Sequence, residues 1–349
     1  MSLDDGPPSR LYWMRAVSFA GLHRLLTAVA AAPGGLRARD VNALVLDGHV
    51  MLTARRSRPK PTTLYHYRNT LIRLGAVVRD GPRLRANRND PEVAALLAEP
   101  APANGDHVAS HAARERFAAL VLKNEDCRAL FFDLFSPARG PDRTVSDFRR
   151  HGAPVSWTRR PRPDPPAIVF RNHATGRETT HASRAAVPAV LYGLRYWARD
   201  ELALIDEYSE RTLDRTTLFP ITAPPADPAD RDAAVLHAVR FLLSLRARHA
   251  DREWTMLSVS DLIVEYCQDR RQPRSVLFGA LDWLRQRWPG HTILVPTPLR
   301  LATLAATSAQ QQDLALRRYY KPANGPYVSH IRLHHDVTTN AEDARRRHA

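Results

Sequence analysis

Residues 63–78 read TLYHYRNTLIRLGAVV and combine a helical apolar pattern, a glycine stop and the start of a strand. At about 100° per residue, one side of a helix over residues 64–74 is apolar or aromatic and carries Leu64, Tyr67, Leu71 and Leu74. The opposite side is polar and carries Thr62, His66, Asn69, Thr70 and Arg73. Thr62 or Thr63 is placed to cap this helix after Pro61, and Gly75 ends it. The sequence therefore predicts an apolar inner face and an outer face suited to hydrogen bonding.

The flanking residues predict two more helices and a hairpin. The apolar spacing indicates helices at 12–31 and 37–46, followed by a basic loop at 55–61. Residues 76–78 and 83–85 have the pattern of short strands, and Asp80-Gly81-Pro82 is typical of a turn. Three helices followed by a hairpin with arginines at its tip is the expected order of the first 90 residues.

Basic charge is concentrated in this part of the chain. The formal net charge is +15, and all basic residues except Lys60, Lys123 and Lys321 are arginine, as in proteins from GC-rich genomes. Between Arg55 and Arg88, ten basic residues stand against the single acid Asp80. Residues 252–288 have six arginines against five acids. Composition alone does not explain this contrast, which favours a polyanionic partner for the N-terminal region.

The element order and residues 63–78 resemble the third helix and first wing strand of winged-helix DNA-binding proteins, over about residues 12–90. The resemblance implies that the third helix lies in the major groove and that the hairpin contacts the DNA backbone or the minor groove. Asn69 and Arg73 are the candidates for base edges. The candidates for phosphate are Arg55, Arg56, Arg58, Lys60, Arg83 and Arg85, with Thr62, Thr63, His66 and Thr70 completing the nucleic-acid surface. A winged helix used only for protein contacts is the alternative.

The whole chain is expected to be mainly α with small β hairpins (α+β), as two winged-helix-like domains that flank a mixed middle domain. The expected domains are residues 1–99, 106–222 and 230–338, with linkers at 100–105 and 223–232 and a polar tail at 339–349. The middle domain is predicted to have helices at 111–123, 129–135 and 183–208 and strands at 153–157, 167–171 and 177–181. The C-terminal domain is predicted to have helices at 233–248, from Ser258 or Ser260 to Cys267, and at 275–287, with strands at 292–295 and 329–333.

The C-terminal domain also resembles a winged helix in the order of its elements, but the helix at 275–287 has a different outer face. Its core stripe is Val276, Leu277, Ala280, Leu281, Leu284 and Trp288. Its outer face shows Ser275, Asp282 and Gln286, and an acid there would repel phosphate. This domain is therefore expected to serve protein contact or dimerisation more than DNA reading, and DNA reading by this domain is the alternative.

Motifs for catalysis, cofactors and metals are missing from the sequence. There is no phosphate-binding glycine loop and no glycine-flanked serine, so we expect a protein that is not an enzyme and has no cofactor. Cys127 and Cys267 are too far apart in sequence to suggest a disulfide framework or a zinc site. His107 with His111, and residues 334–336 (HHD), are expected to be solvated surface groups, the latter in a mobile tail. No apolar run reaches about 18 residues and the N-terminus is polar, which predicts a cytoplasmic protein with no membrane contact.

These features predict a transcription regulator that contacts duplex DNA through the third helix and basic wing of its N-terminal domain. The alternative is a non-catalytic subunit of a bacterial multiprotein complex, either in antiviral defence or in plasmid replication initiation. The second case resembles initiators that use tandem winged helices, at the level of domain plan. A homodimer or protein partner is expected through the C-terminal domain and Leu130–Phe135, whose apolar density predicts either deep burial or an interface.

Overall fold

The computed structural model describes residues 13–46, 61–103, 108–136, 144–160, 167–182, 193–209, 215–223, 225, 227–297 and 317–337. The chain belongs to the mixed α+β class, with helices and small antiparallel sheets. Within the described ranges, no helix is both long and apolar enough to cross a membrane. The chain divides into two compact units, residues 1–153 with 159–204 and residues 154–158 with 205–349. The expected middle domain, 106–222, therefore contributes to both units.

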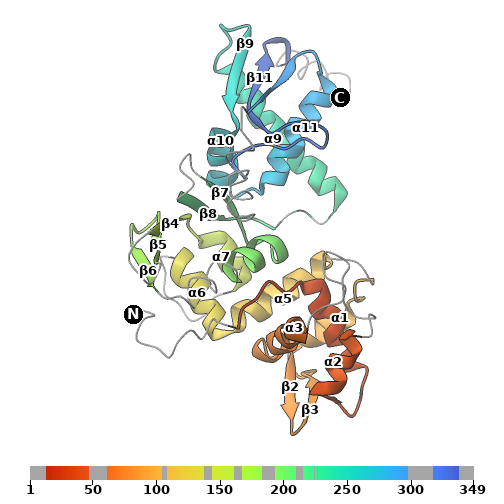
Figure 1. Cartoon of the computed structure of the whole chain (residues 1–349). Helices are drawn as coiled ribbons and strands as arrows, with labels where there is room; N and C mark the ends of the chain where they lie inside the picture. The colour runs from red at the N-terminus through yellow and green to blue at the C-terminus, as the bar shows by residue number, and fades with distance from the viewer. Residues whose placement is uncertain are drawn as a thin grey trace. The chain divides into compact units, whose positions relative to one another are not determined.

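The first unit begins with the order helix, strand, helix, helix, strand, strand (Figure 1). These elements are α1 (Phe19–Ala30), β1 (Leu36–Arg37), α2 (Ala38–Leu46), α3 (Pro61–Arg73), β2 (Val77–Asp80) and β3 (Arg83–Ala86). The strands form one antiparallel sheet in the order β1–β3–β2. The helix predicted from residue 12 begins at Phe19, because the Ser18 hydroxyl accepts a hydrogen bond from the Gly21 amide and caps α1 there.

Helix α3 begins at Pro61, one turn earlier than its apolar pattern required. The expected caps Thr62 and Thr63 therefore lie inside its first turn. Proline suits the first helical position because its φ is preset and it needs no amide partner. Gly75 follows the helix with φ 72°, and Gly81 in the hairpin turn has φ 58°. Both angles lie in the left-handed region that glycine tolerates, and the predicted helix stop and hairpin are confirmed.

Four further helices continue the first unit: α4 (Pro91–Ala98), α5 (His111–Lys123), α6 (Glu125–Phe135) and α7 (Val145–His151). The proposal that Leu130–Phe135 contacts a partner is wrong, because its apolar side chains are buried inside this unit. Phe148 of α7 packs edge-on against three phenylalanines of α6, with ring centroids 5.4–6.0 Å apart. The apolar density of α6 is therefore used within the chain itself.

The first unit ends with a hairpin and a short helical segment. Strands β5 (Ala167–Asn172) and β6 (Glu178–Ala182) form the predicted antiparallel hairpin. The helix expected to reach residue 208 ends instead in a π-helical turn, η3 (Tyr196–Glu201), and residues 205–209 are a strand. Ala203 has φ 48°, a left-handed conformation that cannot continue a right-handed helix.

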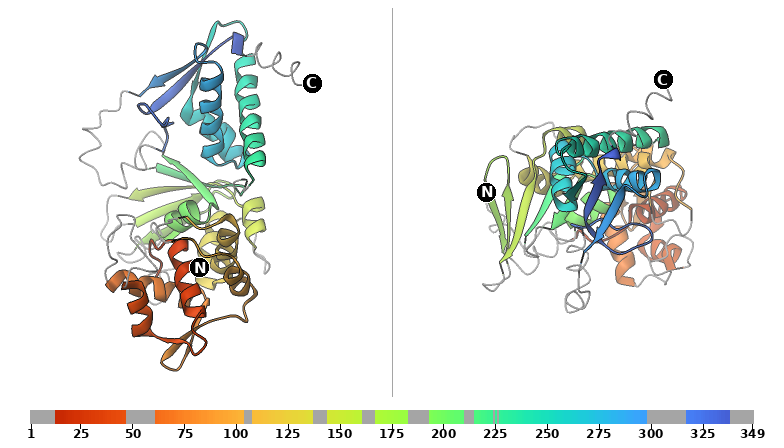
Figure 2. Two further views of the ribbon diagram at one scale, coloured as in Figure 1. Left: turned by 90° about the vertical axis from the view of Figure 1, so that its right-hand side faces the viewer. Right: turned by 90° about the horizontal axis from the view of Figure 1, so that it is seen from above.

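The second unit begins with three strands and then repeats the order of the first six elements of the first unit. Strands β4 (Val155–Arg160), β8 (Arg215–Pro220) and β7 (Ile205–Ser209) pair antiparallel in that order. The repeated elements follow as α9 (Pro228–Ala247), β9 (Trp254–Ser258), α10 (Val259–Leu262) running into η4 (Ile263–Gln268), α11 (Arg274–Arg287), β10 (Thr292–Pro296) and β11 (Val328–His334). Their sheet has the order β9–β11–β10, the same arrangement as β1–β3–β2. Helices α9 and α11 lie side by side in both figures (Figure 2).

The predicted apolar stripe of α11 is confirmed, since all six of its side chains are buried. The N-cap residue of α11, Pro273, makes no side-chain hydrogen bond to the helix. A residue of another element caps the helix instead. Asp206 of β7 accepts hydrogen bonds from the backbone amide of Arg274 at 3.0 Å and from its Nε at 2.9 Å. Both side chains are nearly buried, so this charged pair joins β7 to the start of α11.

Candidate nucleic-acid interface

Two side chains fix the orientation of α3 against α1 and α2. The Tyr67 hydroxyl accepts a hydrogen bond from the Ser18 amide at 3.0 Å. Arg68 Nη1 donates to Asn42 Oδ1 at 3.0 Å and to the Ala38 carbonyl at 3.3 Å. The apolar side of the helix is buried as predicted, at Leu64, Leu71 and Leu74. The opposite side of α3 consequently faces solvent.

The solvent face of α3 carries Tyr65, His66, Asn69 and Arg73. Tyr65 is 51% exposed, Arg73 is exposed, and His66 and Asn69 are half-buried. Within the described ranges, the side chains of Asn69 and Arg73 have no hydrogen-bond or ion-pair partner. Their amide and guanidinium groups are therefore available to an external ligand.

Thr70 does not belong to this face. The helical periodicity placed it on the outer face, whereas the structure buries it completely, at 0% exposed. Thr70 lies three residues after Tyr67 and four before Leu74, both on the inner face. Its hydroxyl has no hydrogen-bond partner in the described part of the chain. A buried hydroxyl without a partner lowers the stability of the fold.

Tyr65 was missed as a candidate. Its ring lies edge-on to that of His66, with centroids 5.7 Å apart, and the Arg68 guanidinium is 5.8 Å from its centroid. The spacing could have predicted its position, because Tyr65 precedes Asn69 by four residues and Arg73 by eight and therefore lies on the same side of the helix. An exposed phenol there can stack on or hydrogen-bond to a nucleobase.

His66 contributes a neutral ring to the solvent face at neutral pH. Partial burial, and to a lesser degree the positive charge of Arg15, lowers the pKa of His66 below its usual value of 6.5. A neutral imidazole donates one hydrogen bond and accepts another, which suits contact with base edges. Its positive charge appears only under acidic conditions.

Two arginines of the hairpin region are engaged within the first unit. Arg83 Nη1 donates to the carbonyls of Gly34, at 2.8 Å, and Gly35, at 3.3 Å, and so ties the hairpin to the loop before β1. Arg88 Nη2 donates to the Ala30 carbonyl at 3.1 Å, at the C-terminal end of α1. Both guanidinium groups satisfy backbone carbonyls and help to fix the sheet against α1.

The remaining two arginines of the hairpin face solvent. Arg85 forms an exposed ion pair with Asp80, its Nη2 3.1 Å from Oδ2. Arg79 on β2 is exposed, and its side chain has no partner among the described residues. Arg79 was counted in the charge of this region but was missed as a contact residue, because sequence does not reveal which arginines have internal partners.

Six of the residues predicted to contact nucleic acid have side chains that the structure does not describe. Arg55, Arg56, Arg58 and Lys60 lie outside the described residues. Thr62 and Thr63 lie in α3, but their side chains are not described. The described candidates Asn69, Arg73, His66, Arg83 and Arg85 all lie on α3 or the hairpin, which follow one another directly in the chain.

Comparisons with models of protein families, with curated proteins and with solved structures gave no match. Burial raises the pKa of both free thiols, Cys127 and Cys267, so that neither is suited to act as a nucleophile at neutral pH.

The second unit presents a different surface on its corresponding helix. Ser275 and Gln286 on α11 are exposed, as expected. Asp282 accepts a hydrogen bond from the Tyr320 hydroxyl and forms a 3.5 Å ion pair with Arg285. The carboxylate is thus held on this helix by its neighbours, where it opposes phosphate binding.

One group of side chains in the described part of the chain has the composition of a metal site: His291, His334 and Asp336. The expectation that residues 334–336 form a mobile, solvated tail is wrong for His334. It is the last residue of the central strand β11, and its side chain is 13% exposed.

Proposed function

We propose that this chain is a non-enzymatic DNA-binding protein of the cytoplasm, a transcription regulator that contacts duplex DNA with α3 and the β2–β3 hairpin. The observation that carries the proposal is the solvent face of α3. It combines an exposed aromatic ring with an amide and a guanidinium that have no partner among the described residues, and it is followed directly by a hairpin whose Arg79 has none there either.

The element order supports a winged-helix arrangement for this region. The helices α1, α2 and α3 followed by the β2–β3 hairpin have the element order on which the resemblance to a winged helix rests. The hairpin projects away from the helices, as a wing does (Figure 1). Arg68 and Tyr67 brace α3 from its inner side, which leaves the outer side to enter a groove.

The chemistry of the outer face fits sequence reading. Arg73 suits the O6 and N7 acceptors of guanine, and Asn69 suits the N6 and N7 edge of adenine. Arg79 and Arg85 are positioned to meet phosphate, although Arg85 must first exchange its exposed pairing with Asp80. An exposed pair of this kind is worth about 1 kcal/mol or less, so phosphate can replace it.

The proposal is tested by selection from a pool of random duplex DNA at increasing salt, followed by binding measurements on the selected sequence. Replacing Arg73 with Ala is expected to weaken the selected site by about 1–3 kcal/mol and to relax the preference at one base pair. Arg171→Ala is the matched control, because it removes an exposed arginine of β5 outside the proposed interface. No binding at low salt, or equal losses for both variants, would contradict the proposal.

A second candidate function, initiation of plasmid replication, is favoured by the repeat of the element order in the second unit. Residues 228–334 reproduce both the helix and strand order and the sheet order of residues 19–86. In this second proposal the first module contacts the DNA, and the second module, whose α11 carries Asp282, serves protein contact or dimerisation. The test is whether a plasmid that carries the selected DNA site, and no other origin, replicates in cells that make the protein.

A further inference from the structure

Two histidines of the second unit face each other across neighbouring strands. Thr292 of β10 pairs with Leu333 of β11, which places His291 opposite His334. The His334 amide donates to the His291 carbonyl at 3.0 Å, and the two ring centroids are 5.0 Å apart. Opposed residues of an antiparallel pair point to the same face of a sheet. The strand register therefore brings the two imidazoles together.

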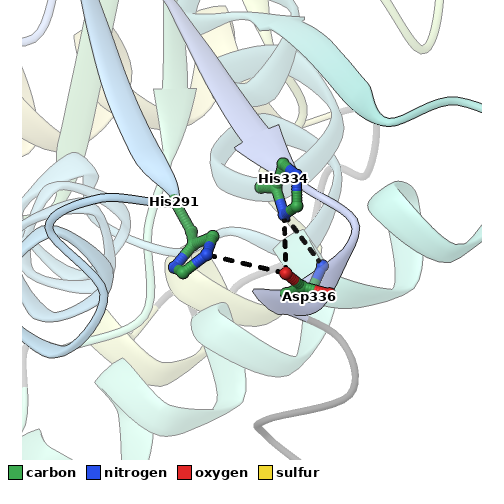
Figure 3. A group of neighbouring side chains, drawn as sticks. All are labelled: His291, His334 and Asp336. Atoms are coloured by element: carbon green, nitrogen blue, oxygen red, sulfur yellow. Dashed lines mark hydrogen bonds and ion pairs between the residues drawn. The ribbon is translucent and has the colours of Figure 1, made fainter.

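A carboxylate completes the group. Asp336 lies two residues after the end of β11, and its Oδ2 lies 3.1 Å from His334 Nδ1 and 3.6 Å from His291 Nε2. All three candidate ligand atoms lie within 4.8 Å of one another. Figure 3 shows both rings directed at the same carboxylate oxygen.

We propose that His291, His334 and Asp336 form a binding site for a divalent transition-metal ion of the Zn²⁺ type. Zn²⁺ binds imidazole nitrogen at about 2.0–2.1 Å and carboxylate oxygen at about 2.0–2.2 Å. Two ligands of a tetrahedral site are then about 3.3 Å apart, between the two distances observed here. Imidazole with carboxylate is a ligand set that favours zinc and similar ions over Ca²⁺ and Mg²⁺.

The surroundings orient the ligands. Glu253 Oε1 lies 3.5 Å from His334 Nε2, on the side of the ring away from the group, and leaves Nδ1 toward the ion. The Trp254 ring packs against the same imidazole, with centroids 4.8 Å apart. His335 Nε2 lies 3.0 Å from Asp336 Oδ1, which leaves Oδ2 for the ion.

One weak contact must be replaced when the ion binds. The Asp336 amide donates to His334 Nδ1 at 3.3 Å, so that the nitrogen that would ligate the ion already accepts a long hydrogen bond. The alternative to a metal site is that His291, His334 and Asp336 form an ion-pair cluster in which the histidines are protonated. Such a cluster would bind no metal, and the two readings are therefore separated by a binding measurement.

The full-length protein, stripped with a chelator, is titrated with Zn²⁺ in competition with a chromogenic chelator. One ion per chain is expected. His291→Ala and Asp336→Asn should each weaken binding at least about tenfold, the range seen when an inner or supporting ligand is lost. His330→Ala, on the same strand but outside the group, is the matched control and should change the affinity less than about twofold.

Thermal unfolding gives a second readout, because an ion that binds the native state raises the Tm. Zn²⁺ should raise the Tm of the wild type and of His330→Ala, and should leave His291→Ala and Asp336→Asn unchanged. His291 is 39% exposed and Asp336 44%, so both variants are expected to fold, which circular dichroism checks. Absence of stoichiometric binding by the wild type, or equal binding by the group variants and the control, would overturn the proposal.

Discussion

Replacing Arg79 with Ala is expected to weaken DNA binding at every sequence without changing stability. The Arg79 side chain is exposed on β2 and has no partner among the described residues, so its loss leaves nothing unsatisfied in the fold. One phosphate contact releases about 0.9 counterion, and the slope of log Kobs against log salt should become shallower by about 0.9. At about 0.1 M salt this equals roughly an eightfold loss of affinity, or about 1.2 kcal/mol.

Arg83→Ala is the comparison that separates binding from structure. The Arg83 guanidinium donates to the carbonyls of Gly34 and Gly35, so its removal frees both carbonyls and loosens the hairpin. Because this contact is exposed, we expect a loss of stability of about 1 kcal/mol, measured by urea denaturation followed by circular dichroism.

The two variants are assayed together by fluorescence anisotropy with a labelled duplex at several salt concentrations. The proposed phosphate contact of Arg79 is refuted if Arg79→Ala leaves the salt slope unchanged, or if it lowers the urea midpoint as much as Arg83→Ala does. The first result would remove the hairpin from the interface, and the second would mean that Arg79 has a structural role.

Three further predictions concern other groups. DNA binding should become more salt-dependent as the pH falls below 6.5, by at most about 0.9 in slope, because His66 then gains charge; His66→Ala should abolish this change in anisotropy titrations. Glu201→Ala should cost about 2 kcal/mol in urea unfolding, because the Phe19 amide at the start of α1 loses its 2.9 Å acceptor; a cost under 0.5 kcal/mol would contradict this role. Asp206→Ala should cost about 3 kcal/mol or more, because Arg274 is left as a buried, unpaired charge; an unchanged midpoint would refute the cross-element cap.

Asp-Pro pairs begin two helices that the sequence did not predict to start there. Asp227-Pro228 lay in the expected linker 223–232 yet begins α9, and Asp90-Pro91 begins α4, for which no helix was predicted. The aspartate accepts a hydrogen bond from the amide two residues later, and proline occupies the first helical position. The same two residue types favour turns elsewhere, so composition alone could not distinguish a helix start from a loop.

The periodicity of α3 predicted its inner face correctly but only part of its outer face. Leu64, Leu71 and Leu74 are buried because apolar side chains at these spacings have one common side. Thr70 was predicted on the outer face but is buried, and Tyr65 was not assigned to either face but is exposed. The partners of Arg83 could not be predicted either, because the Gly34 and Gly35 carbonyls reach it only through the pairing of β1 with β3.

The cap that Asp206 places on α11 links two segments that are 68 residues apart in the chain. The cap on α11 therefore forms only when residues 206 and 274 come together, a contact of long sequence separation. The same separation determines which fragments of the chain retain this cap. A fragment that starts at residue 223 would leave the first amide of α11 and the Arg274 guanidinium without their carboxylate, whereas one that starts at residue 205 would retain it.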